Sequence, residues 1–111
     1  MKIINRDKFL ALPENTLYAK YTPCFFDDIN IKGETVGDDF FTQNISGAVR
    51  CKDTGDFVEI LANAQKTGSS FSMDFSCEDN DGIYDDNQLF AVWEHDDIIA
   101  LINRLTMLVS N

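Results

Sequence analysis

The pattern of hydrophobic and polar residues is clearest between Gln88 and Val109, where a strand leads directly into a long helix. Residues 89–93 form an unbroken apolar run, which favours a strand covered on both faces. From Ile98 onward, apolar residues recur every third or fourth position. At about 100° per residue, this spacing confines them to an arc of roughly 120°. The pattern predicts an amphipathic helix whose apolar side must be covered.

The same periodicity predicts the other elements. Asn5 is a suitable N-cap for a short first helix that ends at Pro13, and Asp53 or Thr54 is a suitable N-cap for a second helix that ends at Gly68. Residues 70–76 alternate polar and apolar side chains, as a strand does. The predicted helices cover residues 6–12, 56–65 and 98–109, and the predicted strands cover residues 16–21, 29–32, 40–45, 70–76 and 89–93.

This order of elements, α-β-β-β-α-β-β-α, predicts the fold class. Strands that follow one another through short links favour an antiparallel meander, and they are not arranged as βαβ units. We therefore expect one α+β domain over residues 1–111, with a single curved antiparallel sheet of about five strands and helices packed on it. The pattern leaves open whether residues 48–51 end a strand or form an extended connection, and whether Ile83 and Tyr84 form a short strand.

Charge adds the main functional signal. The chain has 9 basic and 19 acidic side chains, a net charge of −10. Residues 1–55 carry 7 basic and 8 acidic residues, a net charge of −1, whereas residues 56–111 carry 2 basic and 11 acidic residues, a net charge of −9. Such a field repels nucleic acids and anionic membranes and attracts basic surfaces. The alternative is that the acidity serves only solubility.

The cysteine pattern and the lack of a recognisable targeting signal predict a cytoplasmic chain. The three cysteines, Cys24, Cys51 and Cys77, are odd in number and form no CxxC pair, so we expect reduced thiols that fill the core. The sequence contains neither an apolar run as long as a membrane span nor a signal-peptide pattern at its start.

Two acidic segments contain residue types that can bind a metal ion. Asp79-Asn80-Asp81-Gly82 resembles the middle of a calcium loop, but Cys77 and Gln88 occupy the end positions that need carboxylates. His95 with Asp96 or Asp97 offers nitrogen and oxygen ligands. Since residues 94–97 precede a helix, we interpret them as helix-capping residues, and we expect no metal and no cofactor.

Catalytic patterns are weak in this sequence. His95 is the only histidine, and a strongly acidic surface disfavours a cysteine thiolate. The pairs Asp27-Asp28 and Asp85-Asp86 contain adjacent residues, whose side chains usually point apart. We therefore expect a protein that is not an enzyme.

Interaction with a basic protein surface is the function that the charge favours. The carboxylates of the second half could imitate the phosphates of a nucleic acid, with Tyr84 as an aromatic anchor. The alternative role of Ile83 and Tyr84 is to cover the edge of the core. The predicted partner-binding residues are Asp74, Glu78, Asp79, Asp81, Tyr84, Asp85, Asp86, Glu94, Asp96 and Asp97.

The first part of the chain resembles a known group of proteins. Residues 1–20 (MKIINRDKFLALPENTLYAK), with Ile31-Lys32-Gly33-Glu34 and Asp39-Phe40-Phe41, are similar to small uncharacterised proteins of phages and prophages. The similarity covers roughly the first 45 residues and carries no catalytic motif. It implies a phage protein in the cytoplasm of a host cell, and acidic phage proteins of this size are often inhibitors of host defence enzymes.

These observations lead to one hypothesis and two alternatives. We expect an inhibitor that covers a basic nucleic-acid channel of a host nuclease or CRISPR effector. The first alternative is a small accessory or structural phage protein whose acidity keeps it soluble. The second is a metal-binding protein that uses the acidic loop.

Overall fold

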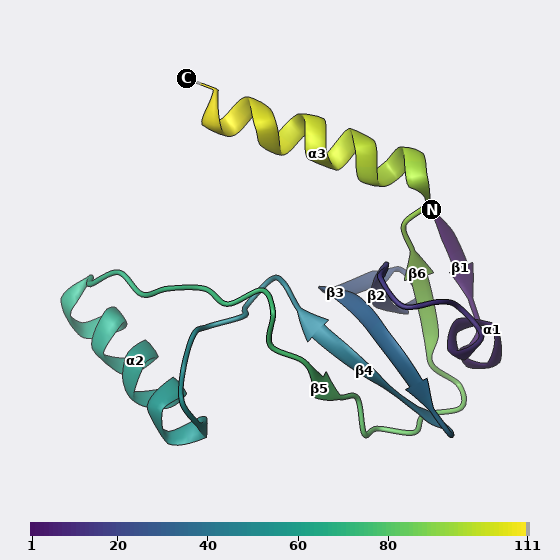
Figure 1. Cartoon of the computed structure of the whole chain (residues 1–111), viewed down its shortest axis with the longest axis horizontal. Coiled ribbons are helices and arrows are strands. Elements are labelled where there is room, and N and C mark those ends of the chain that lie inside the picture. Colours follow the sequence, from purple (N-terminus) through teal and green to yellow (C-terminus); the bar gives the residue numbers. More distant parts are fainter. Residues whose placement is uncertain (111) are drawn as a thin grey trace.

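The computed structural model, which describes residues 1–110, contains one open antiparallel sheet of six strands in the order β1-β6-β2-β3-β4-β5 (Figure 1). The strands are β1 (Lys2–Ile4), β2 (Thr16–Thr22), β3 (Phe25–Val36), β4 (Asp39–Asn44), β5 (Asp79–Asn80) and β6 (Leu89–Val92). The helices are α1 (Arg6–Leu10), α2 (Thr54–Thr67) and α3 (His95–Val109). The predicted α+β class with a single antiparallel sheet is confirmed.

Strand β6 lies inside the sheet because the short strand β1, which the sequence analysis did not predict, pairs with its outer side. On its other side β6 pairs with β2. Phe90 and Ala91 are completely buried. The prediction of a buried strand in this apolar run is confirmed, and the strand ends one residue earlier than predicted, at Val92.

Helix α1 covers one face of the sheet through Phe9. The Phe9 ring stacks on Phe90 with centroids 3.9 Å apart, and it contacts Tyr18 at 4.7 Å and Phe40 at 5.0 Å edge to face. All four aromatic side chains are buried. The predicted cap of α1 is confirmed, since Asn5 Oδ1 accepts a hydrogen bond from the Lys8 amide at 3.0 Å. This aromatic group is the hydrophobic core.

The hairpins β2–β3 and β3–β4 confirm the predicted meander, although β3 is much longer than expected. Lys32 of β3 is buried beside the core, and its ammonium donates to the carbonyls of Leu12 and Gly33 and to Thr35 Oγ1 at 2.8–3.0 Å. Burial lowers the pKa of Lys32. These bonds fasten β3 to the segment that follows α1.

The predicted strand over residues 70–76 is wrong. Only Met73 forms a bridge, with Val49, and Phe71 and Phe75 are 43% and 56% exposed. The physical reason is that this segment has only a short partner. Its backbone bonds to residues 48 and 50, through the Asp74 amide to the Ala48 carbonyl at 2.7 Å and the Arg50 amide to the Ser72 carbonyl at 2.9 Å. The bridge also answers the question about residues 48–51, which form an extended connection.

Helices α2 and α3 extend away from the sheet (Figure 1). The predicted caps of α2 are confirmed, because Asp53 accepts from the Asp56 amide and Gly68 adopts the left-handed conformation at φ +74°. Within the described chain, neither helix buries a residue. The radius of gyration is 15.9 Å, compared with about 13 Å for a compact domain of this length.

Candidate acidic binding surface

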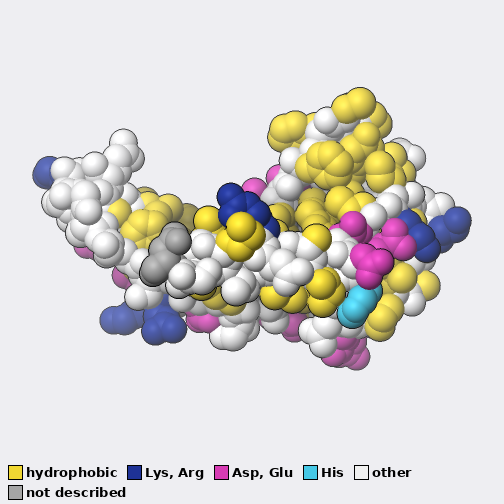
Figure 2. Space-filling view, turned by 90° about the horizontal axis from the view of Figure 1, so that it is seen from above, with side chains coloured by type: hydrophobic (Ala, Val, Ile, Leu, Met, Phe, Trp, Pro, Cys, Tyr) yellow, Lys and Arg dark blue, Asp and Glu magenta, His cyan; other side chains and the backbone are white. Residues whose placement is uncertain are grey.

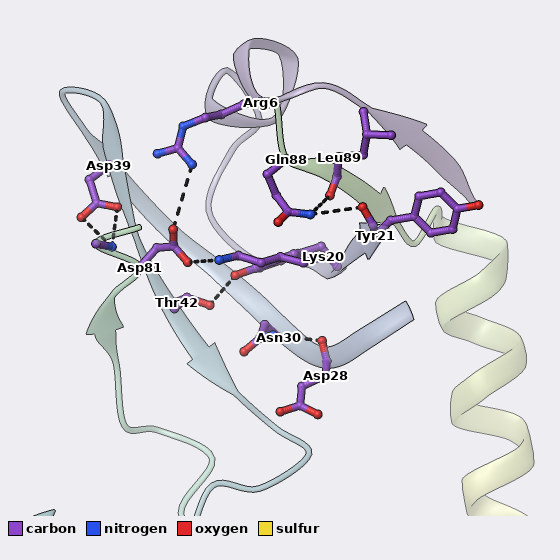
Figure 3. A network of polar contacts seen from close by, with 12 residues as sticks. Arg6, Lys20, Tyr21, Asp28, Asn30, Asp39, Thr42, Asp81, Gln88 and Leu89 are labelled. Atoms are coloured by element: carbon purple, nitrogen blue, oxygen red, sulfur yellow. Dashed lines mark hydrogen bonds and ion pairs between the residues drawn. The ribbon is translucent and has the colours of Figure 1, made fainter. Parts of the chain in front are cut away.

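The acidic loop between β5 and β6 is fastened to the sheet by ion pairs of Asp81 (Figure 3). Asp81 Oδ1 lies 2.6 Å from Lys20 Nζ of β2, and Asp81 Oδ2 lies 4.0 Å from Arg6 Nη1 of α1. The side chains of Asp81 and Arg6 are each 5% exposed, and that of Lys20 is 18% exposed. Arg6 Nη2 also donates to the Asp38 carbonyl at 2.6 Å. The loop, α1 and the β3–β4 turn therefore form one connected unit.

Backbone and side-chain hydrogen bonds fix both ends of this loop. At its start, the Gly82 amide donates to both carboxylate oxygens of Asp39 at 3.1 Å, and the Asp81 amide donates to the Phe40 carbonyl at 3.0 Å. At its end, Gln88 Nε2 donates to the Tyr21 carbonyl at 3.1 Å. Gly82 has φ +68°, a conformation that costs glycine little.

Between these ties the loop presents its side chains to solvent. Ile83 and Tyr84 are 63% and 58% exposed, and they belong to no strand. Asp85 and Asp86 are exposed as well. A turn orders this segment, since the Asn87 amide donates to Asp85 Oδ1 at 2.9 Å. Both side chains are mainly exposed, and Tyr84 also lines a small hollow with Val36, Phe40 and Phe41 at the edge of the core.

Tyr84 adjoins a hollow with acidic walls. The hollow has a volume of about 270 Å³ and is lined by Arg6, Asp7, Leu10, Asp38, Tyr84 and Asp86. Its three carboxylates come from α1, the β3–β4 turn and the loop, and the Arg6 guanidinium is engaged with Asp81 and the Asp38 carbonyl. We refer to Asp7, Asp38, Tyr84, Asp85 and Asp86 as the acidic binding surface.

This arrangement fits the chemistry of a cationic side chain. An ammonium or guanidinium group can lie among the carboxylates while its aliphatic stem contacts Leu10 and the Tyr84 ring. The exposed carboxylates carry their charge at low desolvation cost before binding. A lysine or arginine of a basic protein therefore suits the hollow better than an anion or an apolar ligand.

Several predicted partner-binding residues lie elsewhere. Asp81 is a correction, because its carboxylate is buried in ion pairs with Lys20 and Arg6 and is not presented to a partner. Asp74 belongs to a separate turn, where bonds from Ser76 lower its pKa. Asp79 pairs with Thr42 in β5, and Glu78 lies over Gly33.

A second acidic group lies beyond the opposite end of β6, at the start of α3. The predicted capping role is confirmed, since Glu94 and Asp97 form a capping box. The ammonium of Met1 lies 2.6 Å from Asp97 Oδ2 and 3.2 Å from Glu94 Oε1. Hydrogen bonding with that ammonium is the main cause that lowers the pKa of Asp97. Figure 2 shows the histidine, His95, beside this group of carboxylates. Asp96 is exposed in the same turn.

The other sequence expectations have mixed outcomes. The cysteines are free thiols, but all three are exposed, so their expected role as core residues is wrong. In residues 1–110, no three His, Cys, Asp or Glu side chains come together as a metal site requires. Over the same residues, none of the helices has the length and apolar character needed to cross a bilayer.

Sequence reasoning missed two members of the surface, Asp7 and Asp38. Both lie in the half of the chain whose charge is nearly balanced, so no local excess of acidic residues marks them. One signal was present, because Asp38 belongs to the turn-rich stretch Gly37-Asp38-Asp39, and turns lie at the surface, although the Asp39 side chain in the same stretch is buried. Comparison of the chain with protein-family models, curated proteins and solved structures found no match.

Proposed function

We propose that this chain is a non-enzymatic inhibitor, encoded by a phage, that binds a basic surface of a host defence protein through its acidic binding surface. The observation that carries the proposal is the convergence of Asp7, Asp38 and Asp86 from three elements around the exposed Tyr84. Candidate targets are the nucleic-acid channels of nucleases and CRISPR effectors, because such channels are lined with Lys and Arg.

Rigidity of the loop supports this function. A loop that is already ordered loses little conformational entropy on binding. The ties of Asp81 and Gly82 at its start and of Gln88 at its end hold Tyr84 in place before any partner arrives. Protein interfaces commonly have an aromatic residue at the centre and polar or charged residues at the rim, and Tyr84 with its neighbouring carboxylates has this arrangement.

Net charge supports the choice of partner. A charge of −10 on 111 residues attracts basic surfaces over about one Debye length, about 10 Å at 0.1 M salt. The rim carboxylates Asp85 and Asp86 would mainly raise the association rate, whereas Tyr84 would slow dissociation.

The test is capture of partners from a host lysate followed by inhibition of the captured protein. The wild type should retain a basic nucleic-acid-binding protein at about 0.05 M salt, release it at about 0.5 M salt, and block its binding to nucleic acid. The variant Asp7→Asn/Asp38→Asn/Asp86→Asn should lose both effects. Tyr84→Ala should weaken inhibition at least about 30-fold.

A matched control separates the surface from total charge. Asp27→Asn/Glu59→Gln/Asp96→Asn removes three negative charges from exposed positions outside the hollow. It should bind the partner nearly as tightly as the wild type. Equal losses in both triple variants would contradict the proposed surface, and inhibition that persists in both would leave acidity with a role in solubility only.

A further inference from the structure

Helix α3 carries an apolar stripe that the chain itself does not cover. The stripe consists of Ile98, Leu101, Ile102, Leu105, Leu108 and Val109. Ile102 and Leu105 are each 51% exposed, Leu108 is 59% exposed and Val109 is 82% exposed. Leaving such side chains in water forfeits about 1.5–3 kcal/mol for each one that could be fully buried. A stripe of this kind is typical of a helix that packs against something.

The opposite face of the sheet is apolar and only partly buried. Side chains alternate between the two faces of a strand, and α1 covers the face that carries Tyr18 and Phe90. The register places the intervening residues on the other face, which we name the second face: Ile3, Leu17, Ala19, Tyr21, Ile29, Ile31, Leu89 and Ala91. None of these residues of β1, β2, β3 and β6 is charged. Leu17, Ala19 and Ala91 are buried, Ile3 is 51% exposed and the others are half-buried, so a second copy would contact mainly the larger side chains of this face. Figure 2 shows that hydrophobic side chains also gather on the outside of the molecule.

Surface area indicates how much is left uncovered. The chain of 12.6 kDa exposes 7841 Å², whereas a compact monomer of that mass exposes about 6,200 Å². The excess is about 1,600 Å² for each chain. Helix α2, which also extends from the sheet without a buried residue, accounts for part of this excess. Burial of about 800 Å² on each chain would already give an interface of standard size, about 1,600 Å².

Contacts at the start of α3 direct the helix away from its own sheet. Only Trp93 and Glu94 separate β6 from α3, and the capping box fixes the first turn. The ammonium of Met1 at the end of β1 binds both Glu94 and Asp97. With the helix held in this direction, the stripe of one chain can reach the second face of another chain.

We infer that two copies of this chain form a symmetric dimer in which the apolar stripe of each α3 packs on the second face of the other copy. In a two-fold dimer, each apolar stripe and each second face is covered by the other copy. No uncovered pair of these surfaces remains, so no further copies are added. The stripe and the second face contain no charge, so the contact buries no carboxylate despite the net charge of each chain. These two uncharged surfaces offer no carboxylates to a basic partner, so a second copy of the chain fits them better.

Sedimentation equilibrium of the full chain tests the dimer. We expect a dimer, and Leu105→Asp should raise its dissociation constant at least about 30-fold, because a charge would enter the contact. Thr106→Asp, one position away and outside the stripe, is the control and should leave the constant nearly unchanged. A monomer at all concentrations, or a dimer that tolerates Leu105→Asp, would overturn the proposal.

A mixing experiment tests the exchange itself. Leu105→Asp damages the stripe, and Ile31→Asp damages the second face. Each variant alone loses both contacts of the symmetric dimer, whereas a mixed pair keeps one contact intact. Dimers should therefore form only in the mixture. Pairing of α3 with α3 would not be rescued in this way and would refute the exchange. Should Ile31→Asp fail to fold by circular dichroism, Ile3→Asp, at a 51% exposed position of the same face, replaces it.

Salt separates this proposal from the proposed function. Screening of two chains that each carry −10 should strengthen the dimer, while the same salt should weaken binding to a basic partner. Because salt should change the two affinities in opposite directions, one salt titration can contradict either proposal without contradicting the other.

Discussion

Replacing Asp81 by Asn should show how much stability the buried ion pairs contribute. The substitution removes the charge that lies 2.6 Å from Lys20 Nζ and 4.0 Å from Arg6 Nη1 and leaves both cations. Breaking a buried pair on one side costs about 3–5 kcal/mol. Because Lys20 is 18% exposed and can regain water, we expect the lower end, about 3 kcal/mol.

Urea unfolding followed by the fluorescence of Trp93, the only tryptophan, measures this loss. With an m-value of about 2 kcal/mol/M, the midpoint should fall by about 1.5 M. Asp79→Asn makes the same chemical change at an exposed position two residues earlier, and it should change stability by less than about 0.5 kcal/mol. Lys20→Met should couple to Asp81→Asn by about 1–3 kcal/mol in a double-mutant cycle. A loss in Asp81→Asn no larger than in Asp79→Asn would refute the reasoning.

Three further predictions concern the core, a close contact and the N-terminus. Phe9→Ala should lower the free energy of unfolding by about 3–5 kcal/mol in urea, since it removes the centre of the aromatic core. Gly33→Ala would place a Cβ 2.6 Å from Glu78 Oε2 and 3.0 Å from Phe41 Cβ; because the Glu78 carboxylate ends a flexible side chain and can move aside, the cost should be below about 1 kcal/mol, and smaller still in a Glu78→Ala background. The Asp97 carboxylate and its hydrogen bond raise the pKa of the Met1 ammonium above 8.0, and bonding with that ammonium lowers the pKa of Asp97 below 3.8. This pair should therefore stabilise the start of α3 fully between about pH 4 and 8, and lose that effect as the pH rises through the ammonium pKa or falls through that of Asp97. Amide exchange measured across this pH range checks it, with an N-acetylated chain as control.

Local patterns predicted most of the fold. Caps at Asn5, Asp53 and Gly68 depend on neighbouring residues only, and the structure contains all three. The strand over residues 70–76 failed for a different reason. Alternation shows that a segment can be a strand, but pairing depends on a partner of matching length, and residues 72–74 bond only the short connection at residues 48–50. The edge strand β1 was missed because three residues carry too little periodicity to detect.

The site shows the same division between local and distant information. Tyr84, Asp85 and Asp86 were found because they stand together in one polar segment. Asp81 belongs to that segment too, but Arg6 and Lys20, distant in sequence, draw its carboxylate inward. Composition counts a buried and an exposed carboxylate alike. The separation of anchoring from binding carboxylates therefore requires the tertiary structure.

The two proposed interfaces lie on opposite sides of the sheet, and this arrangement has a functional consequence. The acidic binding surface includes Asp7 of α1, and α1 covers the face of the sheet that carries Tyr18 and Phe90. The second face is the one that the exchanged α3 would cover. A dimer would therefore carry two acidic surfaces, both free. A target with two basic sites, such as a dimeric nuclease, would then be bound at both sites. The first contact would raise the effective concentration for the second, so the overall affinity would exceed that of one contact. Leu105→Asp should consequently weaken inhibition of a dimeric target far more than inhibition of a monomeric one, although residue 105 would contact neither.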